Sequence, residues 1–243
     1  MSSEKLRILA YIPARSGSKR IPNKNIKNFC GKPLIAHTIL RALKNSSIDR
    51  VIVDTDSAKI ARIGKKYGAW VPFLRPQYLA KDTSQLIDSV LYVLDKLRRE
   101  SNYRPDYVML LQATSPLCDQ KDINGCIDLA MKENSESVAT VCETEPLFFT
   151  MKKNLTLSLA NMSKFRSTNS QQLPKGYMLN GNVFLIKTEV LLKEKKFFTD
   201  NARSVITPKL RSIDIDTPED WVMAELLYKN SLKIKKRIST INS

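Results

Sequence analysis

The chain has 243 residues, of which 42% are hydrophobic and 26% are charged. This length supports a globular protein with a sizeable core, and no stretch approaches the roughly 20 apolar residues that a membrane helix needs. The first residues lack the apolar region and cleavage site of a signal peptide, and the four cysteines show no zinc-like spacing. We therefore expect a cytoplasmic protein, and its formal net charge of +16 favours an anionic partner, either nucleic acid or a phosphorylated small molecule.

The N-terminal part of the chain alternates predicted strands with predicted helices. Short apolar runs predict buried strands over residues 6–12, 51–53, 107–111 and 137–141. Amphipathic patterns predict helices over residues 32–44 and 57–67, and a long helix after Asp82 and Thr83. This alternation predicts a three-layer α/β fold, Rossmann-like, with a mostly parallel sheet and a ligand site beyond the carboxyl ends of the strands.

The pattern weakens between residues 143 and 178, which predicts an arm inserted into a single domain of residues 1–243. Strand-like runs return at 182–186 and 211–215. Thr217 and Pro218 then have the residue types of a helix cap and a first helical position.

A basic loop follows the first predicted strand. It runs from Ala14 to Asn25 and combines small residues with Arg15, Lys19 and Lys24. Small residues let backbone N–H groups approach phosphate oxygens, and the cations add charge. The loop therefore predicts a triphosphate site, although a solvated basic turn is the alternative.

Two acids stand near the end of the chain, Asp214 and Asp216. On a strand their side chains would point to the same side, and two adjacent carboxylates repel unless a cation lies between them. A divalent metal with oxygen ligands would satisfy them, and an acidic turn before a helix is the alternative. Together, the basic loop and the acid pair predict phosphoryl or nucleotidyl transfer.

Five ordered segments resemble the acylneuraminate cytidylyltransferases, also called CMP-sialic acid synthetases. They are residues 14–19 with 24–25, 74–76 with 82–83, 110–117, 171–174 with 180–181, and 214–217. The related Kdo cytidylyltransferases carry a different first loop. The resemblance implies a nucleotidyltransferase fold whose arm reaches a second subunit in a homodimer.

The resemblance also implies the chemistry: the anomeric hydroxyl of an acidic nine-carbon 2-keto sugar attacks the α-phosphate of CTP, and pyrophosphate leaves. It assigns the nucleotide to Ala14, Arg15, Gly17, Ser18, Lys19, Lys24, Asn25, Arg75 and Asp82. Arg15, Lys19, Asp214 and Asp216 are the expected catalytic residues, and the two aspartates are expected to hold Mg²⁺ or Mn²⁺. The group that accepts the hydroxyl proton stays open.

The sugar side departs from the family pattern. The resemblance assigns the sugar to Gln112, Phe148, Ser170, Gln171, Asn180, Gly181, Phe197 and Phe198. Sialic-acid enzymes of bacteria often carry a Lys where Phe148 stands and an Arg where Ser170 stands. Because two cations are lost, we expect a di-N-acylated sugar of the legionaminic or pseudaminic type rather than N-acetylneuraminate.

Two alternative interpretations of the sequence concern other functions. One is a cytidylyltransferase for Kdo, against which the first loop argues. The other is a nucleic-acid-binding protein that uses the net charge, but no aromatic residues lie within the basic loop, so we expect no specific nucleic acid partner and no membrane partner. His37, the only histidine, is expected to pack rather than to catalyse.

Overall fold

The computed structural model describes residues 6–145, 149–151, 157–159 and 174–241. Its main sheet has the strand order β10-β6-β9-β5-β1-β4. The strands are β1 (Ile8–Pro13), β4 (Arg50–Asp54), β5 (Tyr107–Leu110), β6 (Ser137–Thr144), β9 (Gly176–Lys187) and β10 (Arg203–Ile206). β9 runs antiparallel to both of its neighbours, and the other pairings are parallel. The predicted mostly parallel sheet is confirmed, and the reversed β9 was not predicted.

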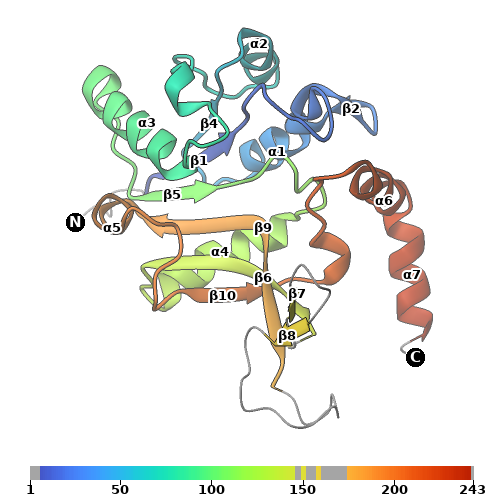
Figure 1. Ribbon diagram of the computed structural model, residues 1–243. Coiled ribbons are helices and arrows are strands. Elements are labelled where there is room, and N and C mark those ends of the chain that lie inside the picture. Colours follow the sequence, from blue (N-terminus) through green and yellow to red (C-terminus); the bar gives the residue numbers. More distant parts are fainter. Residues whose placement is uncertain (1–5, 146–148, 152–156, 160–173, 242–243) are drawn as a thin grey trace.

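Helices cover both faces of this sheet (Figure 1). They are α1 (Leu34–Leu43), α2 (Ala58–Lys66), α3 (Leu86–Ser101), α4 (Gln120–Lys132) and α5 (Thr188–Glu194), whereas α6 (Pro218–Lys229) and α7 (Ser231–Ile241) lie to one side of the sheet. Alternate residues of β1 divide the core: Ile8 packs with α1, α2 and α4, whereas Leu9 packs with α3 and α5. The predicted three-layer α/β architecture is therefore confirmed. None of the helices in the described part of the chain has both the length and the apolarity to cross a bilayer.

Two small antiparallel sheets complete the described structure. β2 (Asn28–Phe29) pairs with β3 (Lys32–Pro33), so α1 begins at Leu34 and not at residue 32 as predicted. β7 (Phe149–Met151) pairs with β8 (Leu157–Leu159) within the predicted arm. This hairpin lies beyond the ends of β6 and β9 (Figure 1). Its role in a dimer stays a prediction.

The predicted strand over residues 211–215 is wrong. A 3-10 helix (η4, Lys209–Arg211) precedes an irregular stretch that leads to α6. This stretch has no sheet partner, and Ile215 N donates instead to the Thr114 carbonyl oxygen at 2.8 Å. The start of α6 follows the prediction, because the Thr217 side chain accepts from Asp220 N and Pro218 takes the first helical position.

Candidate active site

A cleft of about 610 Å³ lies beyond the carboxyl ends of β1 and β5. Its walls combine cationic, acidic and polar side chains from segments that are far apart in the sequence. Those that the sequence predicted are Arg15, Ser18, Lys19, Lys24, Asn25, Arg75, Asp82, Gln112, Asp214 and Asp216. The loop after β1 and the turn after β5 thus meet at one edge, as the positions of the strands predicted.

Two cations of the basic loop are paired with one acid. Arg15 Nη1 lies 2.7 Å from Asp82 Oδ1, and Lys19 Nζ lies 2.5 Å from Asp82 Oδ2. Hydrogen bonds from these two groups hold the pKa of Asp82 below its usual value. All three side chains are substantially exposed, so the attraction is weak and the cations remain available to an anionic ligand.

The loop backbone sits close to the sheet. Ala14 is buried, and its N–H donates to the Asp54 carbonyl oxygen at 2.9 Å. Ser16 N donates to Asp56 Oδ1 at 2.8 Å, which fixes the next part of the loop. Gly17 faces open space, because a Cβ built there would meet nothing within 4 Å. The structure thus shows no steric need for glycine at this position within the chain.

The basic loop also reaches the acid pair. Lys24 Nζ lies 2.6 Å from the Ile215 carbonyl oxygen and 3.1 Å from Asp216 Oδ1. Arg20 Nη1 lies 3.2 Å from Asp216 Oδ2. Cations of the loop therefore contact both Asp82 and Asp216, across the width of the cleft.

Asp214 lies deeper than Asp216. Burial and the nearby negative charge of Asp216 raise its pKa, while a hydrogen bond with the Thr114 side chain and the charge of Lys24 act in the opposite direction. Its Oδ1 atom is buried without a hydrogen-bond partner in the described part of the chain. An unpartnered carboxylate oxygen is costly to bury, which marks this atom as a place for a cation or a donor.

The acid pair fits a divalent cation. Mg²⁺ in nucleotide sites is commonly held by one or two carboxylates, with substrate phosphates and water as the other ligands. No group of three or more potential metal-ligating side chains occurs within the described ranges. Asp214 and Asp216 would therefore supply the protein's ligands, and a bound triphosphate would supply others.

A buried polar cluster supports the wall beside the basic loop. Arg75 donates through Nε to Asp54 Oδ2 at 2.8 Å, and the Tyr11 hydroxyl donates to the same oxygen. Although burial alone would lower the pKa of Arg75, the neighbouring Tyr11 and Asp54 raise it. Asn25 is also buried and donates to the Arg15 carbonyl oxygen at 3.1 Å. Arg75 and Asn25 thus line the cleft from fixed positions.

Gln112 meets Gly181 at the other side of the cleft. Gly181 has a φ of 73°, and a Cβ at this position would lie 3.2 Å from Gln112 Nε2. Glycine therefore serves both the left-handed backbone and the close approach of the glutamine. Gln112 Oε1 also accepts from Thr114 Oγ1 at 3.2 Å, so its amide is oriented at the cleft.

Other residues predicted to bind the sugar lie elsewhere. Asn180 is buried, and its amide bonds Thr140, Thr207 and Ser212, so it holds the fold together instead of facing the cleft. Phe197 packs against Phe184 in the part of the core that lies with α3 and α5, and Phe198 follows it in the chain. Neither phenylalanine lines the cleft of its own chain. Phe148, Ser170 and Gln171 lie outside the described residues.

One wall of the cleft was not predicted from the sequence. It is formed by the segment before α3 and the first turns of that helix, and it contributes Leu79, Lys81, Ser84, Gln85, Leu86 and Ser89. In this region only residues 82–83 had been connected with the site, and only Asp82 had been assigned to the nucleotide. The polar residues between two apolar patterns were the available signal, but turn residues look the same whether or not they line a site.

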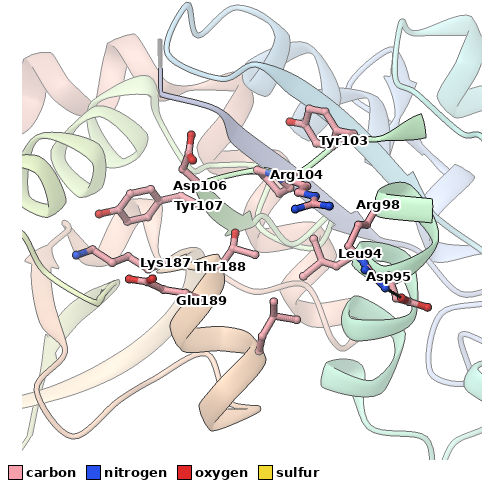
Figure 2. A pocket seen from close by; sticks show the side chains of 12 residues that line it. Leu94, Asp95, Arg98, Tyr103, Arg104, Asp106, Tyr107, Lys187, Thr188 and Glu189 are labelled. Carbon is pink, nitrogen blue, oxygen red and sulfur yellow. Dashed lines mark hydrogen bonds and ion pairs between the residues drawn. The ribbon is translucent and has the colours of Figure 1, made fainter. Parts of the chain in front are cut away.

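A second hollow, of about 780 Å³, lies at the opposite end of the sheet, beside α3 and α5 (Figure 2). Its charged lining residues balance each other: they are Asp95, Arg98, Arg104, Asp106, Lys187 and Glu189. Asp95 already accepts from Arg98 Nη2 at 2.9 Å. This hollow has neither the excess of cations nor the carboxyl-end position of the smaller cleft, and both features favour an anionic ligand in the smaller one.

Comparison with known proteins agrees with this geometry. The family model described as cytidylyltransferase matches residues 9–232. The chain belongs to the cytidylyltransferase family. It is therefore a nucleotidyltransferase, and the predicted resemblance to enzymes that activate acidic sugars is confirmed by its relatives.

Three relatives are informative. The CMP-N,N'-diacetyllegionaminic acid synthase of Legionella pneumophila is 36% identical, over 92% of this chain and 97% of that protein. The pseudaminic acid cytidylyltransferase of Campylobacter jejuni (strain 81-176) is 32% identical, over 91% and 96%. The N-acylneuraminate cytidylyltransferase of Escherichia coli is 32% identical over 94% of this chain but only 54% of that protein.

Solved structures show the same fold. A CMP:2-keto-3-deoxy-manno-octonic acid synthetase complexed with CTP superposes with a TM-score of 0.71 at 16% identity, covering 93% of this chain and 99% of that one. A 4-diphosphocytidyl-2C-methyl-D-erythritol synthase from Anaerococcus prevotii gives 0.66 at 14% identity, covering 93% of this chain and 100% of that one. At these identities the likeness concerns the fold alone.

Proposed function

We propose that the protein transfers CMP from CTP to the anomeric hydroxyl of an acidic nine-carbon 2-keto sugar and releases pyrophosphate. One observation carries the proposal: a cationic loop and a carboxylate pair face each other in one cleft of a cytidylyltransferase. The relatives named after legionaminic, pseudaminic and acylneuraminic acids support the sugar class.

The loop cations would exchange partners when CTP binds. Arg15 and Lys19 hold Asp82 through exposed ion pairs, which a triphosphate with more negative charge can replace. Their charge would then lie on the phosphates and stabilise the negative charge that develops as pyrophosphate leaves. The chain thus supplies orientation and charge neutralisation.

Asp214 and Asp216 would hold Mg²⁺, or Mn²⁺, with the phosphates of CTP. When bound, the metal supplies neutralisation of charge at the reacting phosphate. The buried, unpartnered Oδ1 of Asp214 supports this role. Lys24 contacts Asp216, so it would keep the acid pair oriented while its charge faces the phosphates.

Arg75 and Asn25 would hold the cytidine, because both line the cleft and both are fixed by buried hydrogen bonds. Gln112 and the Gly181 backbone would face the sugar. The sugar itself is proposed to be a di-N-acylated one of the legionaminic or pseudaminic type. The loss of cations at Phe148 and Ser170 and the relatives named after these sugars support this choice.

The substrate is tested by offering CTP and Mg²⁺ with N,N′-diacetyllegionaminate, pseudaminate, N-acetylneuraminate and Kdo in parallel, and by measuring pyrophosphate release. We expect the highest kcat/KM with one of the two diamino sugars. A higher kcat/KM with N-acetylneuraminate would keep the reaction but refute the proposed sugar, and a preference for Kdo would refute the nine-carbon class.

We also propose a cytoplasmic homodimer that binds no specific nucleic acid. Exposed apolar side chains at the end of the arm support an association of two copies: Tyr177, Met178 and Leu179 are each more than two-fifths exposed at the start of β9. Four unpaired cysteines suit a reducing compartment. Sedimentation equilibrium of the purified protein tests the dimer, and a monomer at micromolar concentration would refute it.

A further inference from the structure

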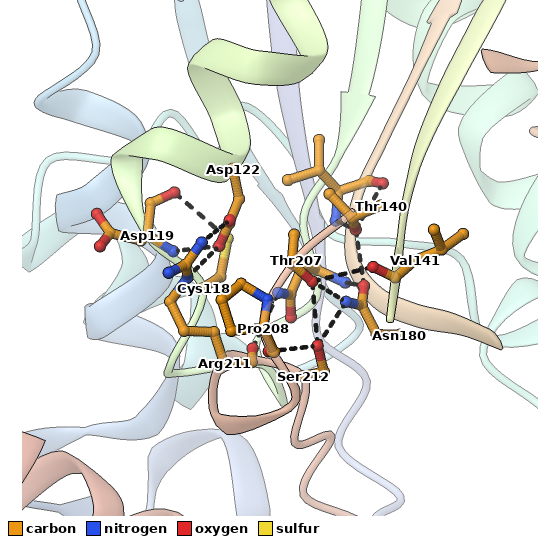
Figure 3. Close-up of polar contacts among 12 residues, drawn as sticks. Cys118, Asp119, Asp122, Thr140, Val141, Asn180, Thr207, Pro208, Arg211 and Ser212 are labelled. Carbon is orange, nitrogen blue, oxygen red and sulfur yellow. Dashed lines mark hydrogen bonds and ion pairs between the residues drawn. The ribbon is translucent and has the colours of Figure 1, made fainter. Parts of the chain in front are cut away.

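Side-chain bonds hold the irregular stretch that carries the acid pair. Arg211, the last residue of η4, lies against Asp122 at the start of α4 (Figure 3). Its Nη2 is 2.6 Å from Asp122 Oδ1 and its Nε is 3.2 Å from Asp122 Oδ2. Asp122 is only 1% exposed, and this two-bond geometry orients the guanidinium firmly.

Asp122 is itself fixed at the amino end of α4. Its Oδ2 accepts from Asp119 N at 2.8 Å in a capping box. The turn before α4 holds the residues of the acid pair at a second point, since the Thr114 carbonyl oxygen accepts from Ile215 N at 2.8 Å. Asp214 therefore lies between two anchored residues, Arg211 and Ile215.

Two buried asparagines of β9 add to this anchoring. Asn180 Nδ2 lies 2.6 Å from Thr207 Oγ1 and 2.8 Å from Ser212 Oγ (Figure 3). Asn182 Nδ2 donates to the Arg211 carbonyl oxygen at 2.9 Å. The residues that lead into Asp214 are thus tied to the sheet by side chains and not by a strand ladder.

We propose that Arg211 and Asp122 form a clasp that positions the Asp214–Asp216 acid pair and thereby sets how tightly the metal is held. This inference rests on the proposed function. A buried ion pair contributes little net stability compared with apolar residues of the same volume, but it fixes geometry. Residues that orient metal ligands typically change metal affinity or activity by about 10–100-fold when they are replaced. Arg211 and Asp122 are positioning residues, because neither lines the cleft.

The test compares Arg211→Lys and Asp122→Asn with the unmodified protein. Lysine keeps the charge of Arg211 but cannot make both bonds. Binding of Mn²⁺ is followed by electron paramagnetic resonance with CTP present and the sugar absent, so the readout does not need turnover. We expect the Mn²⁺ concentration at half-saturation to rise about 10-fold in both variants. The KM for CTP at saturating metal should stay within about 2-fold, because the loop cations are untouched.

Thr199→Val is the matched control for stability. Thr199 and Ser137 share a buried hydroxyl pair at 2.8 Å, and neither residue lines the cleft or bonds Arg211 or Asp122. This variant should lower the melting temperature without changing Mn²⁺ binding. If the clasp variants lose stability but bind Mn²⁺ as the unmodified protein does, the clasp is only structural. That result would refute the proposed role of the clasp and leave the proposed function intact. If the unmodified protein neither binds Mn²⁺ with CTP nor turns over any sugar, both the proposed function and the proposed role of the clasp are refuted.

Discussion

Lys24 joins the basic loop to the acid pair: its Nζ atom lies 2.6 Å from the Ile215 carbonyl oxygen and 3.1 Å from Asp216 Oδ1. The two segments are 191 positions apart in the sequence, and this contact closes the floor of the cleft. Because the Lys24 side chain is mostly buried, its charge acts where water screens it little.

Replacing Lys24 by methionine should therefore lower kcat/KM strongly. The variant keeps the aliphatic stem but loses the charge and both contacts. We expect a loss of about 100-fold, the usual cost of removing one group that stabilises a developing charge. Steady-state kinetics with CTP as the varied substrate measures it. Lys59→Met, on α2 outside the cleft, is the control and should change kcat/KM by less than about 2-fold.

Asp214→Asn should abolish turnover without destabilising the fold. Asparagine retains the shape and the contact with Thr114 but carries no charge. Burial raises the pKa of Asp214, so the ionised carboxylate lowers the free energy of unfolding at neutral pH. The neutral asparagine does not carry this penalty. The melting temperature should therefore not fall, while kcat drops at least about 100-fold. Glu219→Gln is the control, and full activity of Asp214→Asn would contradict the metal assignment.

Asp82→Asn should strengthen the binding of CTP. Asp82 occupies Arg15 and Lys19 when no nucleotide is present, and it must give them up to the phosphates. Without that competition, the Kd for CTP measured by isothermal titration calorimetry should fall by about 2–5-fold at low salt, and the gain should shrink as salt is raised. A weaker affinity would instead support the direct role in nucleotide binding that the family resemblance implies for Asp82.

The candidate site could be predicted where its residues are contiguous. The basic loop and the acid pair each lie within a short stretch whose residue types already indicate phosphate and metal. The conformation of residues 211–216 could not be predicted. Residues 211–215 alternate like a strand, but they are held by Asp122 and Thr114, which only the tertiary structure brings near. The burial of Asn180 could not be predicted for the same reason, because a buried amide and a ligand-facing one look identical in sequence.

The fold was predictable from the alternation of strand and helix patterns along the chain, except for the direction of β9. Residues 182–186 were predicted as a strand, and they lie within β9. The pattern of apolar residues does not encode strand direction, because both faces of a central strand are buried whether it runs parallel or antiparallel. Only the structure reveals that β9 is reversed and that Asn180 and Asn182 form hydrogen bonds with the residues that lead into Asp214.

Gly181→Ala should disturb the sugar side selectively. The left-handed φ disfavours alanine by about 1–2 kcal/mol, and the new Cβ would press on the Gln112 side chain at 3.2 Å. We expect a lower melting temperature and a KM for the sugar raised about 5–10-fold, with the KM for CTP nearly unchanged. Gly17→Ala, whose Cβ would enter open space, should leave the melting temperature unchanged. Equal effects on both KM values would contradict the sugar assignment of Gln112.

His37 should make the stability of the protein depend on pH. It is the only histidine, is buried, and contacts the Phe29 carbonyl oxygen through Nε2 at 2.8 Å. Burial lowers its pKa, so the unfolded chain binds a proton more readily than the folded one. The free energy of unfolding should then fall as pH drops through about 6.5, by no more than about 1.4 kcal/mol per pH unit. Urea titrations between pH 7.5 and 5.5 measure this, and His37→Gln should flatten the dependence.

Phosphorus NMR of the reaction mixture tests most directly whether the cleft joins CMP to an acidic nine-carbon sugar. With CTP, Mg²⁺ and N,N′-diacetyllegionaminate, the three triphosphate signals should be replaced by one phosphodiester signal and by pyrophosphate, and Asp214→Asn should leave them intact. Pyrophosphate without a phosphodiester signal would mean hydrolysis of CTP to CMP. Unchanged CTP with every nine-carbon sugar would contradict the account.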